Sequence, residues 1–484
     1  MVRRRSIQLA FIALTALAVG RPAFAAGPPE ADAEELARRG YLDQALTTAQ
    51  RRQATHPADV ANHEFLIDLL LTVGRSAQAE SAFAERLRKA PDNPDNHYLL
   101  GRALVDVRHA REAYENALRL DPEHARSHMG IAAVHSAQGR HGDAEAAYRR
   151  AVVFDPSLSE AWLGLVRTYG QAGQADRAAK AASDGLAAVP NDPGLALAVA
   201  TLEPERAGPV LSSAVVVTPS DVPLRVAWAS FLLHTGDATA AATEARTALS
   251  IEPGHTEGRR LAMVAAEVAD GRLTRDQADT LEAQRTDPTA LDGLLAAAPR
   301  SSLARLARAQ LHHQEGRPEA ARTLLQEAVD LDPSNDEALA SCGHAWLVAG
   351  DPNRAAPLLE KAVAARPWDA ESTIHLAAAL GSQGMTSRSL GLLGELAEAR
   401  PMHVVAQAAY AQALLDAGRA EEAYQLLKAA MERLPDPRIA AAFIMVAPEA
   451  GHHEEAAAIM ELIAEKTGNP ALKQKAAALR AAGQ

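Results

Sequence analysis

Cysteine and aromatic residues are scarce in this chain of 484 residues. Cys342 is its single cysteine, and only 4% of the residues are Phe, Trp or Tyr. An internal disulfide is therefore impossible, so stability has to come from packing. No stretch alternates polar and apolar residues for long enough to suggest a sheet. Beyond the N-terminal region, no run approaches the roughly 20 apolar residues that a membrane-spanning helix needs.

The sequence motifs of several enzyme classes are also missing. The chain has no glycine-rich nucleotide-binding loop, no nucleophile elbow and no isolated pair of acids in an aromatic setting. His124 and His128 have the spacing of two metal ligands on one helix, but no Cys, Asp or Glu completes a recognisable ligand set. We therefore expect a protein that is not an enzyme, holds no metal and needs no cofactor. The histidines are interpreted as helix-packing residues.

Basic residues are outnumbered by acidic ones, 49 Lys and Arg against 61 Asp and Glu, which gives a net charge of -12. Binding to nucleic acid depends on neutralising phosphates, and attraction to bare anionic lipid also depends on basic residues. The charge therefore disfavours both nucleic acid and a lipid surface as partners.

The first 25 residues have the pattern of a secretory signal peptide. Three arginines at positions 3–5 precede an apolar stretch over residues 7–19, and Ala23-Phe24-Ala25 offers the small residues of a cleavage site. The adjacent arginines also raise the twin-arginine export route, which stays open beside the general one. We expect the mature chain in the periplasm of a Gram-negative bacterium, with secretion as the alternative and no transmembrane segment after cleavage.

Prolines recur along the chain with a step of 34 residues, a period that is typical of stacked copies of one supersecondary unit. In the unit that ends at Pro156, apolar residues at helical spacing stand on both sides of Gly139. Each unit is therefore expected to be two amphipathic helices joined by a glycine turn. The closing prolines are Pro57, Pro91, Pro122, Pro156, Pro190, Pro219, Pro253, Pro288, Pro333, Pro367, Pro401, Pro435 and Pro470.

Small residues recur at one place in these units, for example Ala144, Ala178, Ala355 and Ala423. With this spacing the chain resembles the tetratricopeptide repeat family, in which small residues let helices approach and bulky ones fill the gaps. The resemblance implies an all-α fold, a right-handed α-α superhelix of about thirteen helix-turn-helix repeats. Cys342 stands where a residue packs between the helices, so we expect it to be a buried apolar side chain.

The regularity of the proline step predicts how the chain is organised. Between Pro190 and Pro299 the step is irregular, so we expect a change of curvature or a flexible joint there. The predicted parts are a signal peptide (1–25), an N-terminal repeat array (26–190), degenerate repeats with a central irregularity (191–299), a C-terminal repeat array (300–470) and a capping helix (471–484).

In the family that the chain resembles, the first helix of each pair lines a concave groove. Arg102 and Arg167 suggest a clamp for a carboxylate of a partner, and the alternative is that they pair with neighbours such as Asp68. The resemblance implies a peptide- or protein-binding groove formed by Asp68, Tyr98, Arg102, Met129, Arg167, Gln171, Gln310, His313, His344 and Gln412.

The repeats fill the chain beyond the predicted signal, which leaves no room for a catalytic domain. We therefore interpret the chain as a non-enzymatic periplasmic scaffold that binds a peptide or protein partner in its groove, in the assembly of an envelope, export or pilus complex. The alternative is a helical, glycan- or cell-wall-binding accessory subunit of a polysaccharide-processing or export enzyme. Tyr98 is almost the only aromatic residue of the predicted groove, which weakens the alternative.

Overall fold

The computed structural model describes residues 33–38, 42–434 and 436–482. The predicted signal peptide lies outside the described residues. The regular structure of the described chain is helical throughout, without a strand, and the expected all-α superhelical repeat fold is confirmed. No helix in this part of the chain is long and apolar enough to cross a membrane.

The described chain forms two compact units, and the boundary between them lies between Ala269 and Asp270. Unit 1 contains α1 (Ala33–Arg38), α2 (Leu42–Thr55), α3 (Val60–Thr72), α4 (Ser76–Lys89), α5 (Pro94–Ala103), α6 (Val107–Leu120), α7 (Ala125–Ala137), α8 (His141–Phe154), α9 (Ser159–Gln171), α10 (Ala175–Ala188), α11 (Pro193–Leu202), the 3-10 turn η1 (Pro204–Arg206), α12 (Ala207–Val217), α13 (Val222–Thr235), α14 (Ala238–Ile251) and α15 (Thr256–Ala269).

Unit 2 begins with α16, whereas α15 belongs to unit 1. The boundary therefore falls inside the helix pair that was predicted to close at Pro288. Its helices are α16 (Arg275–Ala283), α17 (Pro288–Ala297), α18 (Ser302–Gln314), α19 (Pro318–Leu331), α20 (Asp336–Val348), α21 (Pro352–Ala365), α22 (Ala370–Ser382), α23 (Thr386–Ala399), α24 (Val404–Asp416), α25 (Ala420–Arg433), α26 (Pro437–Glu449), α27 (His453–Thr467) and α28 (Pro470–Ala482).

Caps and glycines set the ends of these helices. Asp59 accepts the amide N–H groups of Ala61 (3.0 Å) and Asn62 (3.4 Å) through one carboxylate oxygen, which satisfies donors that the first turn of α3 leaves free. Gly139 and Gly173 end their turns with φ of 72° and 70°, a left-handed conformation that other residues adopt only with strain. The glycine turn between the two helices of a pair was therefore predicted correctly.

In unit 1 a side chain at the start of a helix pair closes the preceding turn. His63, His97 and His128 donate the Nε2 hydrogen to the carbonyls of Pro57, Pro91 and Pro122, at 2.9, 2.8 and 2.9 Å. The Trp162 indole does the same for Pro156 at 2.9 Å. Because a carbonyl only accepts, each of these imidazoles must carry its hydrogen on Nε2.

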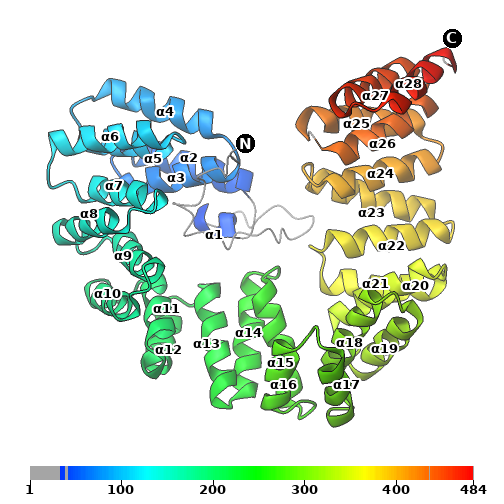
Figure 1. Cartoon of the computed structure of the whole chain (residues 1–484), viewed down its shortest axis with the longest axis horizontal. Helices are drawn as coiled ribbons and strands as arrows, with labels where there is room; N and C mark the ends of the chain where they lie inside the picture. The colour runs from blue at the N-terminus through cyan, green and yellow to red at the C-terminus, as the bar shows by residue number, and fades with distance from the viewer. Residues whose placement is uncertain (1–32, 39–41, 435, 483–484) are drawn as a thin grey trace. The chain divides into compact units, whose positions relative to one another are not determined.

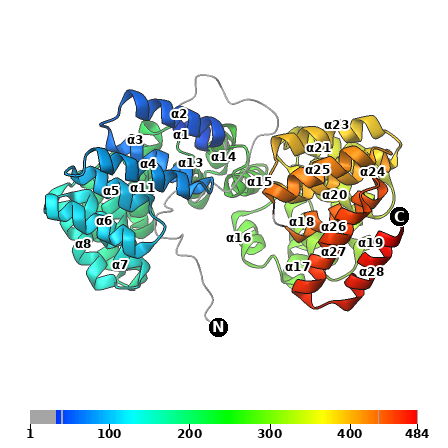
Figure 2. The ribbon, with the colours of Figure 1, turned by 90° about the horizontal axis from the view of Figure 1, so that it is seen from above.

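The helix pairs stack in sequence within each unit (Figures 1 and 2). In unit 1 the first helices of successive pairs also contact one another, α3 with α5, α5 with α7 and α7 with α9. Figure 1 shows α5, α7 and α9 on the inner side of the curve of unit 1 and α6, α8 and α10 on its outer side. The inner surface of unit 1 is therefore formed by first helices.

Candidate functional site

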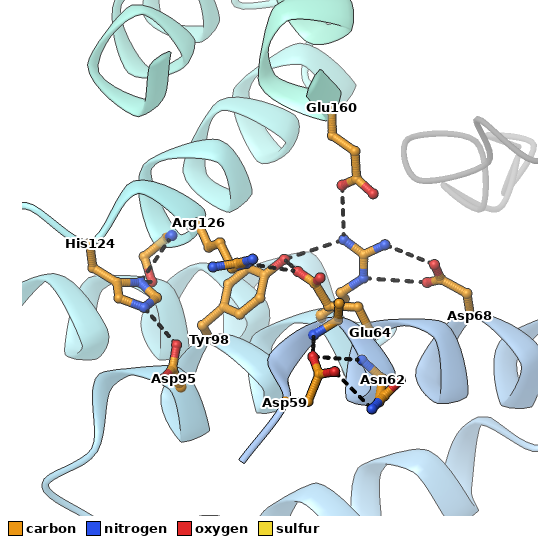
Figure 3. A network of polar contacts seen from close by, with 12 residues as sticks. Asp59, Asn62, Glu64, Asp68, Asp95, Tyr98, His124, Arg126 and Glu160 are labelled. Carbon is orange, nitrogen blue, oxygen red and sulfur yellow. Dashed lines mark hydrogen bonds and ion pairs between the residues drawn. The ribbon is translucent and has the colours of Figure 1, made fainter. Parts of the chain in front are cut away.

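Arg102 of α5 is the buried centre of a group of polar side chains on the first helices of unit 1. Its guanidinium donates to both carboxylate oxygens of Asp68 on α3, from Nη2 at 2.8 Å and from Nε at 3.3 Å. Nη1 lies 3.3 Å from Glu160 of α9 and 3.3 Å from the Tyr98 hydroxyl (Figure 3). Only 5% of the surface of Arg102 is exposed. A bidentate contact of this kind fixes a guanidinium firmly.

Glu64 of α3 extends this group toward α7. The Tyr98 hydroxyl donates to Glu64 Oε1 at 2.5 Å, and Nε of Arg126 lies 3.5 Å from the same oxygen. Burial raises the pKa of Glu64 and of Asp68 above their ordinary values, and Arg102 offsets only part of that effect. We call this group the Arg102 network, and it joins α3, α5, α7 and α9. Its members are Glu64, Asp68, Tyr98, Arg102, Arg126 and Glu160.

His124 and Asp95 lie beside the Arg102 network (Figure 3). His124 Nδ1 accepts the backbone N–H of Ser127 at 3.2 Å, so Nε2 carries the hydrogen and donates to Asp95 at 3.0 Å. That hydrogen bond lowers the pKa of Asp95. His128, four residues on, donates to Pro122 instead. The two imidazoles therefore take part in separate hydrogen bonds and do not converge on a common point.

The predicted carboxylate clamp does not form. Arg102 is buried and already bound to carboxylates of this chain, whereas Arg167 is exposed on α9. The alternative, that Arg102 pairs with Asp68, is what the structure contains. Tyr98 and Met129 are 0% and 3% exposed, so neither offers a surface to a partner. Helical position alone placed them toward the groove, but neighbouring helices cover them.

Unit 2 holds an open cavity of about 530 Å³ between α22 and α24, with α23 beneath it. Its floor includes Ile374, Leu390 and Leu393, and small residues such as Ala378 line its walls. Asp416 is the one ionisable residue among the side chains that line it. We call this cavity the α22–α24 groove, and its volume is in the range of typical ligand sites.

The polar end of the α22–α24 groove is formed by Ser382, Thr386, Gln412 and Asp416. The Gln412 amide donates to Asp416 Oδ1 at 2.7 Å. One of the predicted groove residues, Gln412, therefore lies in this cavity. The groove combines an apolar floor with hydroxyl, amide and carboxylate groups at one end.

The remaining predicted residues are dispersed over both units. Gln171 and His313 are exposed at the ends of α9 and α18. Gln310 donates to Glu337 at 3.0 Å. His344 of α20 stacks on His375 of α22, with ring centroids 4.0 Å apart and planes within 1°.

Sequence reasoning passed over Glu160 and the small residues of the α22–α24 groove. Glu160 stands in the first turn of α9, and Ala378 stands about one turn before Gly381 and Ser382 on α22. In the repeat pattern, these residues stand at groove-facing positions of a first helix, as Gln412 does. The prediction favoured bulky and polar side chains, whereas small residues are the ones that leave space for a groove.

Three family models, each described as tetratricopeptide repeat, match residues 106–159, 137–202 and 262–436. The cytochrome c-type biogenesis protein CycH of Rhizobium meliloti (strain 1021) is 30% identical over 172 residues, which are 33% of this chain and 45% of that protein. The match thus spans less than half of CycH.

Solved structures of helical repeat proteins are also similar. TTC0263, a thermophilic TPR protein of Thermus thermophilus, is 22% identical with a TM-score of 0.30, over 35% of this chain and 94% of that one. The APC/C hetero-tetramer Cut9-Hcn1 is 14% identical with a TM-score of 0.30, over 85% of this chain and 94% of that one. On the family matches and the helix pairs described above, the chain is a tetratricopeptide-repeat protein.

Proposed function

We propose that this chain is a non-enzymatic scaffold that holds a segment of a partner protein in the α22–α24 groove. The observation that carries the proposal is the cavity of about 530 Å³ between two first helices of unit 2. Unit 1 has its inner polar groups engaged with one another in the Arg102 network, so we assign it a structural role. Stacked helical repeats form concave binding surfaces, which agrees with the proposed scaffold role of unit 2.

The proposed place of action is the periplasm, on the strength of the signal-like N-terminus. The proposed process is assembly of an envelope complex. The printed name of CycH makes the biogenesis of c-type cytochromes one candidate for that process. Fusing residues 1–25 to alkaline phosphatase, which is active only outside the cytoplasm, tests export. An inactive fusion would contradict the periplasmic assignment.

A protein segment is a better occupant of the groove than a glycan. The side chains that line the groove include no aromatic ring on which a sugar could stack. They do include an amide, hydroxyls and small residues, which allow a peptide backbone to approach closely. Glycan binding by this site is therefore the weaker proposal.

Affinity capture from a periplasmic extract tests the proposal. Ala378 is exposed in the groove, so Ala378→Trp fills the space without disturbing the core. Ala364 is exposed on α21, outside the lining of the groove, so Ala364→Trp is a matched control. The expected result is a partner recovered with the wild type and Ala364→Trp and lost with Ala378→Trp. Equal recovery with all three chains would overturn the proposal.

A further inference from the structure

The α22–α24 groove has an apolar floor and a single charged group at one end. Leu393 and Ala377 are buried beneath it, and Ile374 and Leu390 are half-buried at its base. Burying a leucine-sized side chain here removes apolar surface from water on both partners, which favours binding. The floor therefore fits an apolar side chain.

The charged end carries a carboxylate that forms no ion pair with another described residue. Asp416 is exposed and accepts one hydrogen bond from the neutral amide of Gln412. The cations on adjoining segments are already paired: Arg388 of α23 lies 3.0 Å from Glu360, and Arg419 lies 2.6 Å from Glu422. A cation brought in by a partner can therefore approach Asp416 without displacing an existing ion pair.

Building on the proposed function, we infer that the α22–α24 groove selects an extended segment in which a large apolar residue stands next to lysine or arginine. The apolar side chain occupies the floor over Leu390 and Leu393. The basic side chain reaches the Asp416 carboxylate. The Ser382 hydroxyl donates to the Ala378 carbonyl at 2.9 Å and can still accept from the backbone of the segment. Gln412 keeps its second amide hydrogen and its carbonyl oxygen for the same purpose.

Asp416 also offers a charge reversal that the fold tolerates. It is the last residue of α24, where the helix dipole favours a positive side chain over a negative one. Asp416→Lys should therefore leave thermal stability unchanged or slightly raised. Any change in binding by this variant then reports on recognition.

The test is an array of synthetic dodecapeptides with a glycine-serine frame and two adjacent variable positions. The first is Leu, Phe or Ser, and the second is Lys, Arg, Glu or Ser. The full mature chain should be retained best by Leu or Phe next to Lys or Arg, with about a fivefold preference over the Glu peptides, the size of a favourable exposed ion pair. Asp416→Lys should reverse the charge preference, and Ala378→Trp should abolish retention, whereas Ala364→Trp should not.

Two results would overturn the inference. The first is retention that ignores Asp416→Lys and Ala378→Trp, and the second is no preference among the peptides. In either case, loss of the natural partner with Ala378→Trp would still uphold the scaffold function. If partner capture is also indifferent to Ala378→Trp, both the inference and the proposed function fail.

Discussion

At the scale of single residues, three histidines of unit 1 share one structural role. His63, His97 and His128 occupy the place that Trp162 takes in the next pair, and all four donate a ring N–H to the carbonyl of the preceding closing proline. Arg225 and Arg259 make the same contact further along, at 2.6 and 2.9 Å. The position thus requires a donor at the end of a long side chain.

Substitution of His128 tests this explanation. His128→Phe removes the donor and leaves the Pro122 carbonyl without its partner, at an expected loss of about 1 kcal/mol in the free energy of unfolding. His128→Trp keeps an N–H at that place, as in Trp162, and should be closer to the wild type. Urea unfolding measures both values. Equal losses for the two variants would show that packing, not the hydrogen bond, matters there.

Burial also predicts how stability depends on pH. Burial lowers the pKa of six histidines below their ordinary value of 6.5, so the unfolded chain binds more protons near and below that pH. Stability should be full above pH 6.5 and fall as the pH drops through that value toward the folded-state pKa values. The histidines are His63, His128, His135, His255, His375 and His403.

The carboxyls of Glu64 and Asp68 act in the opposite direction, because their raised pKa values let the folded chain bind protons at a higher pH than the unfolded chain does. Their effect extends from the ordinary pKa values of 4.5 and 3.8 up to the raised ones, but the six histidines outnumber these two carboxyls. Urea unfolding at pH 7.5, 6.5 and 5.5 should therefore give decreasing free energies. A free energy that rises on acidification over this range would contradict the histidine account.

Arg102 and Arg167 should differ sharply when each is replaced by alanine. Arg102→Ala leaves Asp68, Glu64 and Glu160 facing one another without the buried cation, and a loss of about 3–5 kcal/mol is expected. Arg167 is exposed, so Arg167→Ala should change stability by no more than about 0.5 kcal/mol. Thermal or urea unfolding of the two variants is decisive. Similar losses would disprove the structural role of the Arg102 network.

At the scale of helices, glycines and tyrosines determine how closely neighbouring pairs pack. Gly101 and Gly130 lie against the ring of Tyr114, where an added Cβ would come within 2.6 and 2.7 Å of ring carbons. Gly164 of α9 lies against the ring of Tyr148 in the same manner. Each tyrosine therefore fills a space that glycines on neighbouring helices leave open.

Two glycines of α9 provide a matched test. Gly164→Ala would place a Cβ against the ring of Tyr148, and overpacking of this kind costs about 1–3 kcal/mol, from which a gain in helix propensity subtracts up to about 1 kcal/mol. Gly170 has open space around it, so Gly170→Ala should gain up to about 1 kcal/mol. Circular dichroism melts measure both. Two changes of the same sign would contradict the packing account.

The helices were largely predictable, since the signals for their ends are local. Glycine turns and closing prolines placed them, as Gly139 and Pro156 do for α7 and α8. Burial on the inner face was not predictable in this way. Arg102 is buried by Asp68 and Glu160, which lie 34 and 58 residues away, and helical spacing contains no information about such contacts.

At the scale of the whole molecule, the two units are assigned different roles. Unit 1 has an inner surface whose carboxylates and guanidinium groups neutralise one another, which stabilises the stacking of α3, α5, α7 and α9. Unit 2 has the α22–α24 groove, whose described lining leaves space and includes one carboxylate, that of Asp416. The boundary between the units falls within residues 191–299, and a flexible joint in that region stays a prediction.

The central claim is that a partner segment occupies the α22–α24 groove, and hydrogen exchange of the full mature chain tests it most directly. The exchange should be measured with and without the partner recovered by capture. Binding should slow amide exchange in residues 374–393 and 404–416, while α3, α5, α7 and α9 stay unchanged. Protection confined to unit 1, with residues 374–416 unaffected, would contradict the claim.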